Sequence, residues 1–121
     1  KSIHTPGHTS CHSSFLIPEL SILFSGDLIP SPEYPGRTDL PTGNIPQMLD
    51  SIEKIMELKP EVVVPSRGET IRGKNVQKVL EMHRNFFASI IEKRGELPIE
   101  WPKPTATCMW WTPNPKWEIY Q

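Results

Sequence analysis

The sequence predicts an α/β fold in which a small mixed sheet is covered by helices on one face. Short apolar runs of strand composition occur at residues 13–17, 21–25 and 61–64, and turn residues separate them. Two longer stretches, 45–58 and 75–94, repeat apolar residues at the three- and four-residue spacing of an amphipathic helix. The resulting order of strands and helices is typical of a single layered domain.

The strands are expected to pair locally before the chain crosses to the helices. Residues 2–4 end a first strand, and the runs 13–17 and 21–25 are expected to form an antiparallel hairpin around the turn 18–20. A long loop follows at 28–44, with four prolines and two glycines. Loops of this length inside a compact domain are usually functional, so we expect this one to have a function beyond connecting two elements.

Capping residues mark where each helix is expected to begin and end. Asn44 is a suitable N-cap for the first helix, with Pro46 in its first turn, and Pro60 stops it. Asn75 is a candidate N-cap for the second helix, and Gly95 is a suitable residue just past its end.

Composition bounds the classes of function. A length of 121 residues supports one domain. A net charge of −1 gives no indication of the basic surface that nucleic-acid binding requires. The apolar runs are too short to span a membrane, and no apolar leader precedes the first motif. The two cysteines, Cys11 and Cys108, form no CxxC pattern, so we expect reduced thiols in a cytoplasmic protein.

Two stretches near the start carry candidate metal ligands. In residues 4–9, HTPGHT, Pro6 fixes its own φ and Gly7 can take a positive φ, so His8 lies on a tight turn. Asp27 follows an apolar run that is predicted to form a buried strand. Imidazole and carboxylate are ligand types that zinc and iron share, and this pair therefore predicts a metal site.

At these residues the sequence resembles the metallo-β-lactamase superfamily. Residues 4–9 and 23–28 (LFSGDL) are similar to its third and fourth motifs, in the right order. Residues 36–41 (GRTDLP) are similar to a stretch of the glyoxalase II and persulfide dioxygenase branches. Residues 62–68 (VVVPSRG) fall where the fifth motif, usually Pro-Gly-His-Gly, is expected.

The resemblance implies half of a four-layer α/β/β/α sandwich. It covers residues 1–95 and corresponds to the C-terminal half, which leaves 96–121 as an extended tail with all four tryptophans and five prolines. One face of the sheet would then need a cover. The expected partner is the missing N-terminal half of the fold or a second copy of the chain, and the tail could cover part of the face, close over a cleft or form an interface.

The resemblance also assigns roles to three residues. It implies that His8 is a metal ligand and that Asp27 is the carboxylate that bridges two metals or binds one. Arg67 stands where the fifth motif has its histidine, and a guanidinium cannot ligate a metal. Arg67 could pair with Asp27 in place of a second metal, bind a substrate anion, or turn away into solvent.

The remaining histidines have simpler interpretations. His4 is expected to make a structural hydrogen bond, and His83 lies on the apolar stripe of the second helix as a core or interface residue. His12 and Cys11 stand where the family more often has Ser and Gly. The spacing of His4, His8 and His12 would align them on a helix, but Pro6 and Gly7 prevent one, so the spacing is interpreted as accidental.

Two functions of different classes remain open at this point. The first is part of a metal-dependent hydrolase that uses metal-bound water on a small thioester or ester substrate, with zinc or iron in the complete fold. The second is a metal-free relative that acts as a binding or assembly module. The family's first motif, His-x-His-x-Asp-His, is absent from the sequence, so this chain alone is expected to bind no metal tightly.

Overall fold

A five-stranded mixed sheet forms the centre of the protein. The computed structural model describes residues 1–38 and 40–92. The strands lie in the order β1-β2-β3-β4-β5, namely β1 (Ser2–His4), β2 (Ser13–Ile17), β3 (Ile22–Gly26), β4 (Val62–Pro65) and β5 (Ile71–Arg72). All neighbours are antiparallel except β3 and β4, which are parallel. The predicted mixed sheet is therefore confirmed.

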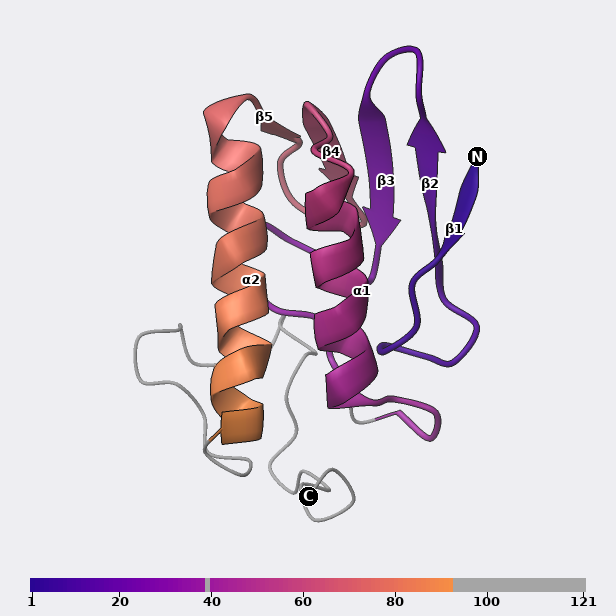
Figure 1. Ribbon diagram of the computed structural model, residues 1–121, viewed down its shortest axis with the longest axis vertical. Coiled ribbons are helices and arrows are strands. Elements are labelled where there is room, and N and C mark those ends of the chain that lie inside the picture. Colours follow the sequence, from indigo (N-terminus) through magenta and orange to yellow (C-terminus); the bar gives the residue numbers. More distant parts are fainter. Residues whose placement is uncertain (39, 93–121) are drawn as a thin grey trace.

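Two helices lie side by side on one face of this sheet, as Figure 1 shows. They are α1 (Ile45–Glu57) and α2 (Lys74–Glu92). The apolar stripe of each helix packs against the inward residues of the central strands, including Leu23 and Val63, which are fully buried. Burial of these stripes places the core between the helices and one face of the sheet only.

The structure departs from the sequence-based elements in two places. The second helix begins at Lys74, so Asn75 lies within its first turn and is not its N-cap. Strand β5 was not predicted, because two residues are too few for an alternating pattern; it exists through its antiparallel pairing with β4. The expected helix end at Gly95 and the tail at 96–121 lie outside the described residues.

The first helix begins as its sequence predicts. Asn44 has an extended backbone, and its Oδ1 accepts a hydrogen bond from the Gln47 N–H at 2.9 Å. Pro46 occupies the first turn, where no helical N–H is needed. This cap matters for the site because Asn44 also contacts the histidine turn, as described below.

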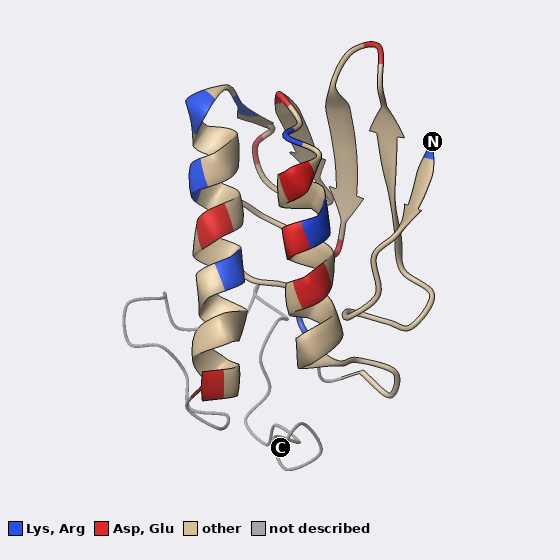
Figure 2. Ribbon diagram, in the orientation of Figure 1, with Lys and Arg blue, Asp and Glu red and all other residues tan. Residues whose placement is uncertain are grey.

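The other face of the sheet is apolar and has no layer on it within the described residues. Strands β1 to β4 contain no Asp, Glu, Lys or Arg, whereas both helices carry many (Figure 2). Phe15 and Phe24 are paired across β2 and β3 and are 54% and 41% exposed. Neighbouring outward positions continue this surface, which we call the outer sheet face: Phe15, Ile17, Ile22, Phe24, Val62 and Val64.

Among residues 1–38 and 40–92, neither helix is long and apolar enough to cross a membrane.

Candidate metal centre

The site forms where the two parallel strands end. The carboxyl ends of parallel strands meet at one edge of a sheet, and here Gly26 at the end of β3 pairs with Pro65 at the end of β4. The next residues along the chain, Asp27 and Ser66, are therefore brought together although they are 39 positions apart. A turn closed by the Leu28 N–H on the Ser25 carbonyl holds Asp27 at this edge.

The histidine turn is attached to α1 through its main-chain carbonyls. Three groups of the helix and its cap donate to them: Lys54 Nζ to His4 O at 2.8 Å, Ser51 Oγ to Pro6 O at 2.7 Å, and the Asn44 N–H to Gly7 O at 2.8 Å. These three bonds attach the turn to the helix along its length.

Glycine is required at position 7 of this turn. Its φ is +142°, and a Cβ there would collide with the main chain of Met48. The absence of a side chain lets the turn pack directly on α1 and presents His8 toward Asp27.

His8 and Asp27 face each other with fixed orientations. His8 Nδ1 lies 2.9 Å from the Arg37 carbonyl, which only accepts, so Nδ1 carries the hydrogen and donates it. The lone pair of the neutral ring is then on Nε2, 3.3 Å from Asp27 Oδ2. Two acceptor atoms that face each other need a cation between them, either a proton on Nε2 or a metal ion. A backbone carbonyl on the second ring nitrogen is typical of metal-binding histidines.

His12 holds the main chain of Asp27. The Asp27 N–H donates to His12 Nε2 at 3.0 Å, while Nδ1 lies 2.9 Å from Thr5 Oγ1 and 3.2 Å from Thr5 O. Because Nε2 accepts the Asp27 N–H, it carries no hydrogen and the ring is neutral. Burial, and then the neighbouring His8, lower the pKa of His12. Gly26 makes this contact possible, because a Cβ there would lie 2.8 Å from His12 Nε2.

Sequence reasoning missed this role of His12. It treated the spacing of His4, His8 and His12 only as a pattern for ligands on a helix. The relevant signal is the hairpin register, which returns β3 beside the residues that open β2.

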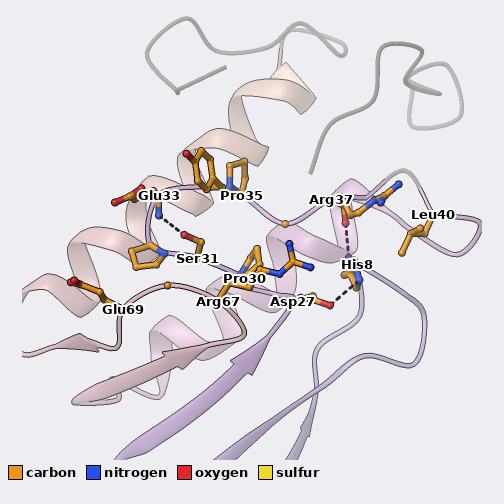
Figure 3. Close-up of a pocket in the computed structure, with 14 residues that line it drawn as sticks. His8, Asp27, Pro30, Ser31, Glu33, Pro35, Arg37, Leu40, Arg67 and Glu69 are labelled. Atoms are coloured by element: carbon orange, nitrogen blue, oxygen red, sulfur yellow. Dashed lines mark hydrogen bonds and ion pairs between the residues drawn. The ribbon is translucent and has the colours of Figure 1, made fainter. Parts of the chain in front are cut away.

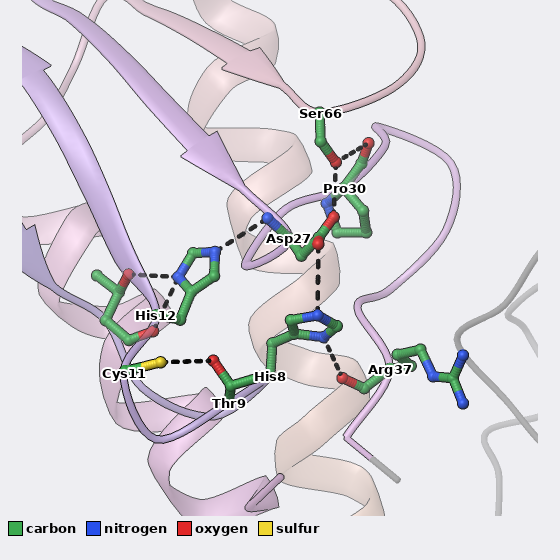
Figure 4. A network of polar contacts seen from close by, with 9 residues as sticks. His8, Thr9, Cys11, His12, Asp27, Pro30, Arg37 and Ser66 are labelled. Carbon is green, nitrogen blue, oxygen red and sulfur yellow. Dashed lines mark hydrogen bonds and ion pairs between the residues drawn. The ribbon is translucent and has the colours of Figure 1, made fainter. Parts of the chain in front are cut away.

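Ser66 contacts the carboxylate of Asp27 from the other strand. Its hydroxyl donates to Asp27 Oδ1 at 2.8 Å, as Figure 4 shows together with the two histidines. Sequence reasoning gave Ser66 no role, although it directly follows the last buried strand and precedes Arg67.

A cleft of about 730 Å³ opens beside these side chains. One end of the cleft contains His8 and Asp27, with Arg67 beside them (Figure 3). The other end contains Glu33 and Glu69, and proline side chains of the 28–44 loop line the wall between the two ends. The long loop that the sequence predicts to be functional thus forms much of the lining of this cleft.

Comparison with known proteins identifies the family. Residues 1–67 match the sequence profile of the Metallo-beta-lactamase superfamily, which is more than half of the chain. The chain belongs to this superfamily.

Individual relatives agree with this assignment. The hydroxyacylglutathione hydrolase GloC of Haemophilus influenzae is 33% identical over 63 residues, which are 51% of this chain and 29% of GloC. The crystal structure of TTHA1623 in a di-iron-bound form superposes with a TM-score of 0.55 at 34% identity, over 60% of this chain and 36% of that one.

A more distant structure shares the fold. The metallo-beta-lactamase family protein TTHA1429 of Thermus thermophilus superposes with a TM-score of 0.66 at 22% identity, over 77% of this chain and 31% of that one. The chain therefore spans only 29% to 36% of the length of these three proteins.

Arg67, which the sequence places where the fifth motif is expected, lies on the segment that follows β4. Its side chain is exposed and lines the cleft, and its main-chain N–H donates to the Pro30 carbonyl at 2.7 Å. In the part of the chain that the structure describes, no ion pair joins Arg67 to Asp27; the partners of that carboxylate are Ser66 and His8. The cleft is thus shared by Arg67 and Asp27, but a direct pair between them is not formed.

His83 binds the 28–44 loop, which forms one wall of the cleft. It is fully buried on α2, with Nε2 3.0 Å from Ser31 O and 3.1 Å from Tyr34 O, and Nδ1 2.9 Å from Val79 O. Burial lowers the pKa of His83 more than these carbonyls raise it. The expected core position of His83 is confirmed, and it fixes the 28–44 loop to the helix.

The remaining candidates make other contacts. The Nε2 of His4 makes the expected structural hydrogen bond, 2.9 Å from Ser10 O. Cys11 is exposed, with its Sγ 3.8 Å from Thr9 Oγ1. Over residues 1–38 and 40–92, no group of three or more His, Cys, Asp or Glu side chains is placed to hold a metal ion. The described residues therefore bring together His8 and Asp27, the two residues that the sequence predicts as metal ligands.

Proposed function

We propose that this chain contributes His8 and Asp27 to the metal centre of a metal-dependent hydrolase. The observation that carries the proposal is the 3.3 Å approach of His8 Nε2 to Asp27 Oδ2, with Nδ1 already donating to the Arg37 carbonyl. This arrangement leaves one lone pair on each residue directed to the same place, which suits a shared cation. Further ligands, such as those of the His-x-His-x-Asp-His motif, would come from outside these residues.

The metal we expect is zinc or iron. Imidazole nitrogen and carboxylate oxygen bind both, and the similar protein TTHA1623 was crystallised with two iron ions. A bound ion of either kind lowers the pKa of a coordinated water, so that hydroxide is available near neutral pH.

The residues of this chain would orient the ligands and the substrate. Arg37 O sets the tautomer of His8, and His12 and Ser66 hold the main chain and the carboxylate of Asp27. Arg67, in the same cleft and without a carboxylate partner among the described residues, is suited to bind an anionic group of the substrate.

The substrate class we favour is a small thioester or ester. The similar GloC is a hydroxyacylglutathione hydrolase, and a cleft of about 730 Å³ has room for a small molecule. The carbonyl under attack would lie near His8 and Asp27, with its anionic group toward Arg67.

The experiment compares thioester hydrolysis and metal content of the full-length protein with those of His8→Ala and Asp27→Asn. Loss of a ligand should lower kcat/KM by about 100-fold or more and reduce bound metal. Arg72→Ala, at an exposed position on β5, is the control and should change neither. Ligand variants with unaltered activity and metal content would contradict the proposal.

The second candidate is a metal-free binding module. It is favoured by Arg67 in place of a ligand and by the hydroxyl of Ser66 on Asp27 Oδ1. A full-length protein that purifies without metal, gains no activity when zinc or iron is added, and still binds a small anionic ester would support this candidate over the hydrolase.

A further inference from the structure

The Ser66 hydroxyl has a single hydrogen and two oxygens within reach. Asp27 Oδ1 lies at 2.8 Å and the Pro30 carbonyl at 3.5 Å. Pro30 O already accepts the Arg67 N–H at 2.7 Å, and a carboxylate is the stronger acceptor. The Ser66 hydroxyl therefore donates its hydrogen bond to Asp27 Oδ1.

This bond decides the orientation of an otherwise poorly packed side chain. The side chain of Asp27 is 48% exposed, so surrounding atoms alone do not select its rotamer. His12 holds the Asp27 N–H but makes no hydrogen bond with the carboxylate. Ser66 on Oδ1 is the contact that turns Oδ2 toward His8 Nε2.

We propose that Ser66 is a positioning residue that makes Asp27 present one carboxylate oxygen, Oδ2, to a cation shared with His8. The orientation of Asp27 stands on the geometry alone, whereas the shared cation rests on the proposed function.

The orientation is tested by NMR on the 121-residue chain, labelled with ¹³C and ¹⁵N. Three-bond couplings from the Asp27 carboxyl carbon to the main-chain nitrogen and carbonyl carbon report its χ1 rotamer. The unaltered chain should show one rotamer, and Ser66→Ala should move the couplings by about a third or more toward a rotamer average. Ser66→Thr keeps the hydroxyl and should retain the original couplings.

The result that overturns the assignment is a Ser66→Ala chain whose Asp27 couplings equal those of the unaltered chain. Ser66 is exposed, so both variants should fold, and unchanged amide spectra of the sheet would show that they do. A merely structural role would alter the unfolding midpoint but not select the Asp27 rotamer.

The shared cation is tested by metal analysis of the full-length protein. Ser66→Ala should hold less metal than the unaltered protein, whereas Ser66→Thr should hold as much, because only the alanine leaves Oδ2 without a contact that directs it toward His8. Equal metal content in Ser66→Ala and the unaltered protein would overturn the role of Ser66 at the cation. Absence of metal from every variant would contradict the proposed function, whereas the couplings would still decide the role of Ser66.

Discussion

At the scale of single residues, hydrogen bonds select which ring nitrogen each histidine uses. His8 donates from Nδ1 to a carbonyl and directs Nε2 toward Asp27, whereas His12 accepts the Asp27 N–H on Nε2 and has Nδ1 against Thr5. The two rings lie edge to face, 6.0 Å apart, yet they serve different purposes. The His8 ring is suited to bind a metal ion, and the His12 ring positions Asp27, the residue that faces His8.

Replacement of Arg67 by histidine tests whether its side chain occupies a metal-ligand position. Arg67→His should raise the metal content of the full-length protein, because an always-charged guanidinium is exchanged for an imidazole beside His8 and Asp27. Metal is measured after dialysis by atomic emission, with Arg72→His on β5 as the control. Unchanged content in Arg67→His would mean that this side chain does not point to the metal position.

At the scale of elements, the two helices fix different sides of the site. α1 receives the histidine turn through Asn44, Ser51 and Lys54, and α2 receives the 28–44 loop through His83. Only the parallel pair β3 and β4 carries Asp27 and Ser66. The site therefore depends on the packing of both helices against one sheet.

The burial of His83 should make stability depend on pH. Burial lowers its pKa below the ordinary value of 6.5, so on acidification the unfolded chain takes up a proton that the folded chain does not. The free energy of unfolding is thus highest above pH 6.5 and falls as the pH drops toward the folded-state pKa.

The His83→Gln variant isolates this effect. Its amide can still donate to the loop carbonyls, but it cannot titrate. Its unfolding free energy, measured by urea denaturation from pH 7.5 to pH 5, should decline less steeply than that of the unaltered chain, by up to about 1.4 kcal/mol per pH unit. Identical slopes for both proteins would contradict a lowered pKa at His83.

At the scale of the whole molecule, the outer sheet face needs a cover. Its aromatic and aliphatic side chains include Phe15 and Phe24, which remain 54% and 41% exposed. An apolar patch of several hundred Å² is more than soluble monomers usually carry, and covering it is worth on the order of 10 kcal/mol before the costs of association. We expect a second sheet on this face, from an N-terminal half of the same fold or from another copy.

Sedimentation of the 121-residue chain at micromolar concentration tests this expectation. The chain should self-associate or bind a hydrophobic dye, and Phe24→Lys should weaken the association at least tenfold. Met82→Lys is a matched control, because Met82 is 42% exposed but lies on α2. A stable monomer that binds no dye would show that the outer sheet face is already covered.

Local patterns in the sequence determined the elements of this fold and two of its site residues. The helical repeat and the Asn44 cap predicted α1, the apolar stripe placed His83 in the core, and the HTPGHT and LFSGDL motifs identified His8 and Asp27. These features depend on residues within about one or two helical turns of each other, so they can be read without the fold.

The tertiary structure alone decided which side chains complete the site. His12 reaches the Asp27 N–H across 15 positions, and Ser66 reaches its carboxylate across 39. Strand β5 likewise exists only through β4. The partner of Asp27 Oδ1 is Ser66, whereas the sequence had left open whether the neighbouring Arg67 pairs with Asp27 or turns into solvent. The physical reason is that these contacts follow from strand register and from the parallel alignment of β3 and β4, which no local pattern encodes.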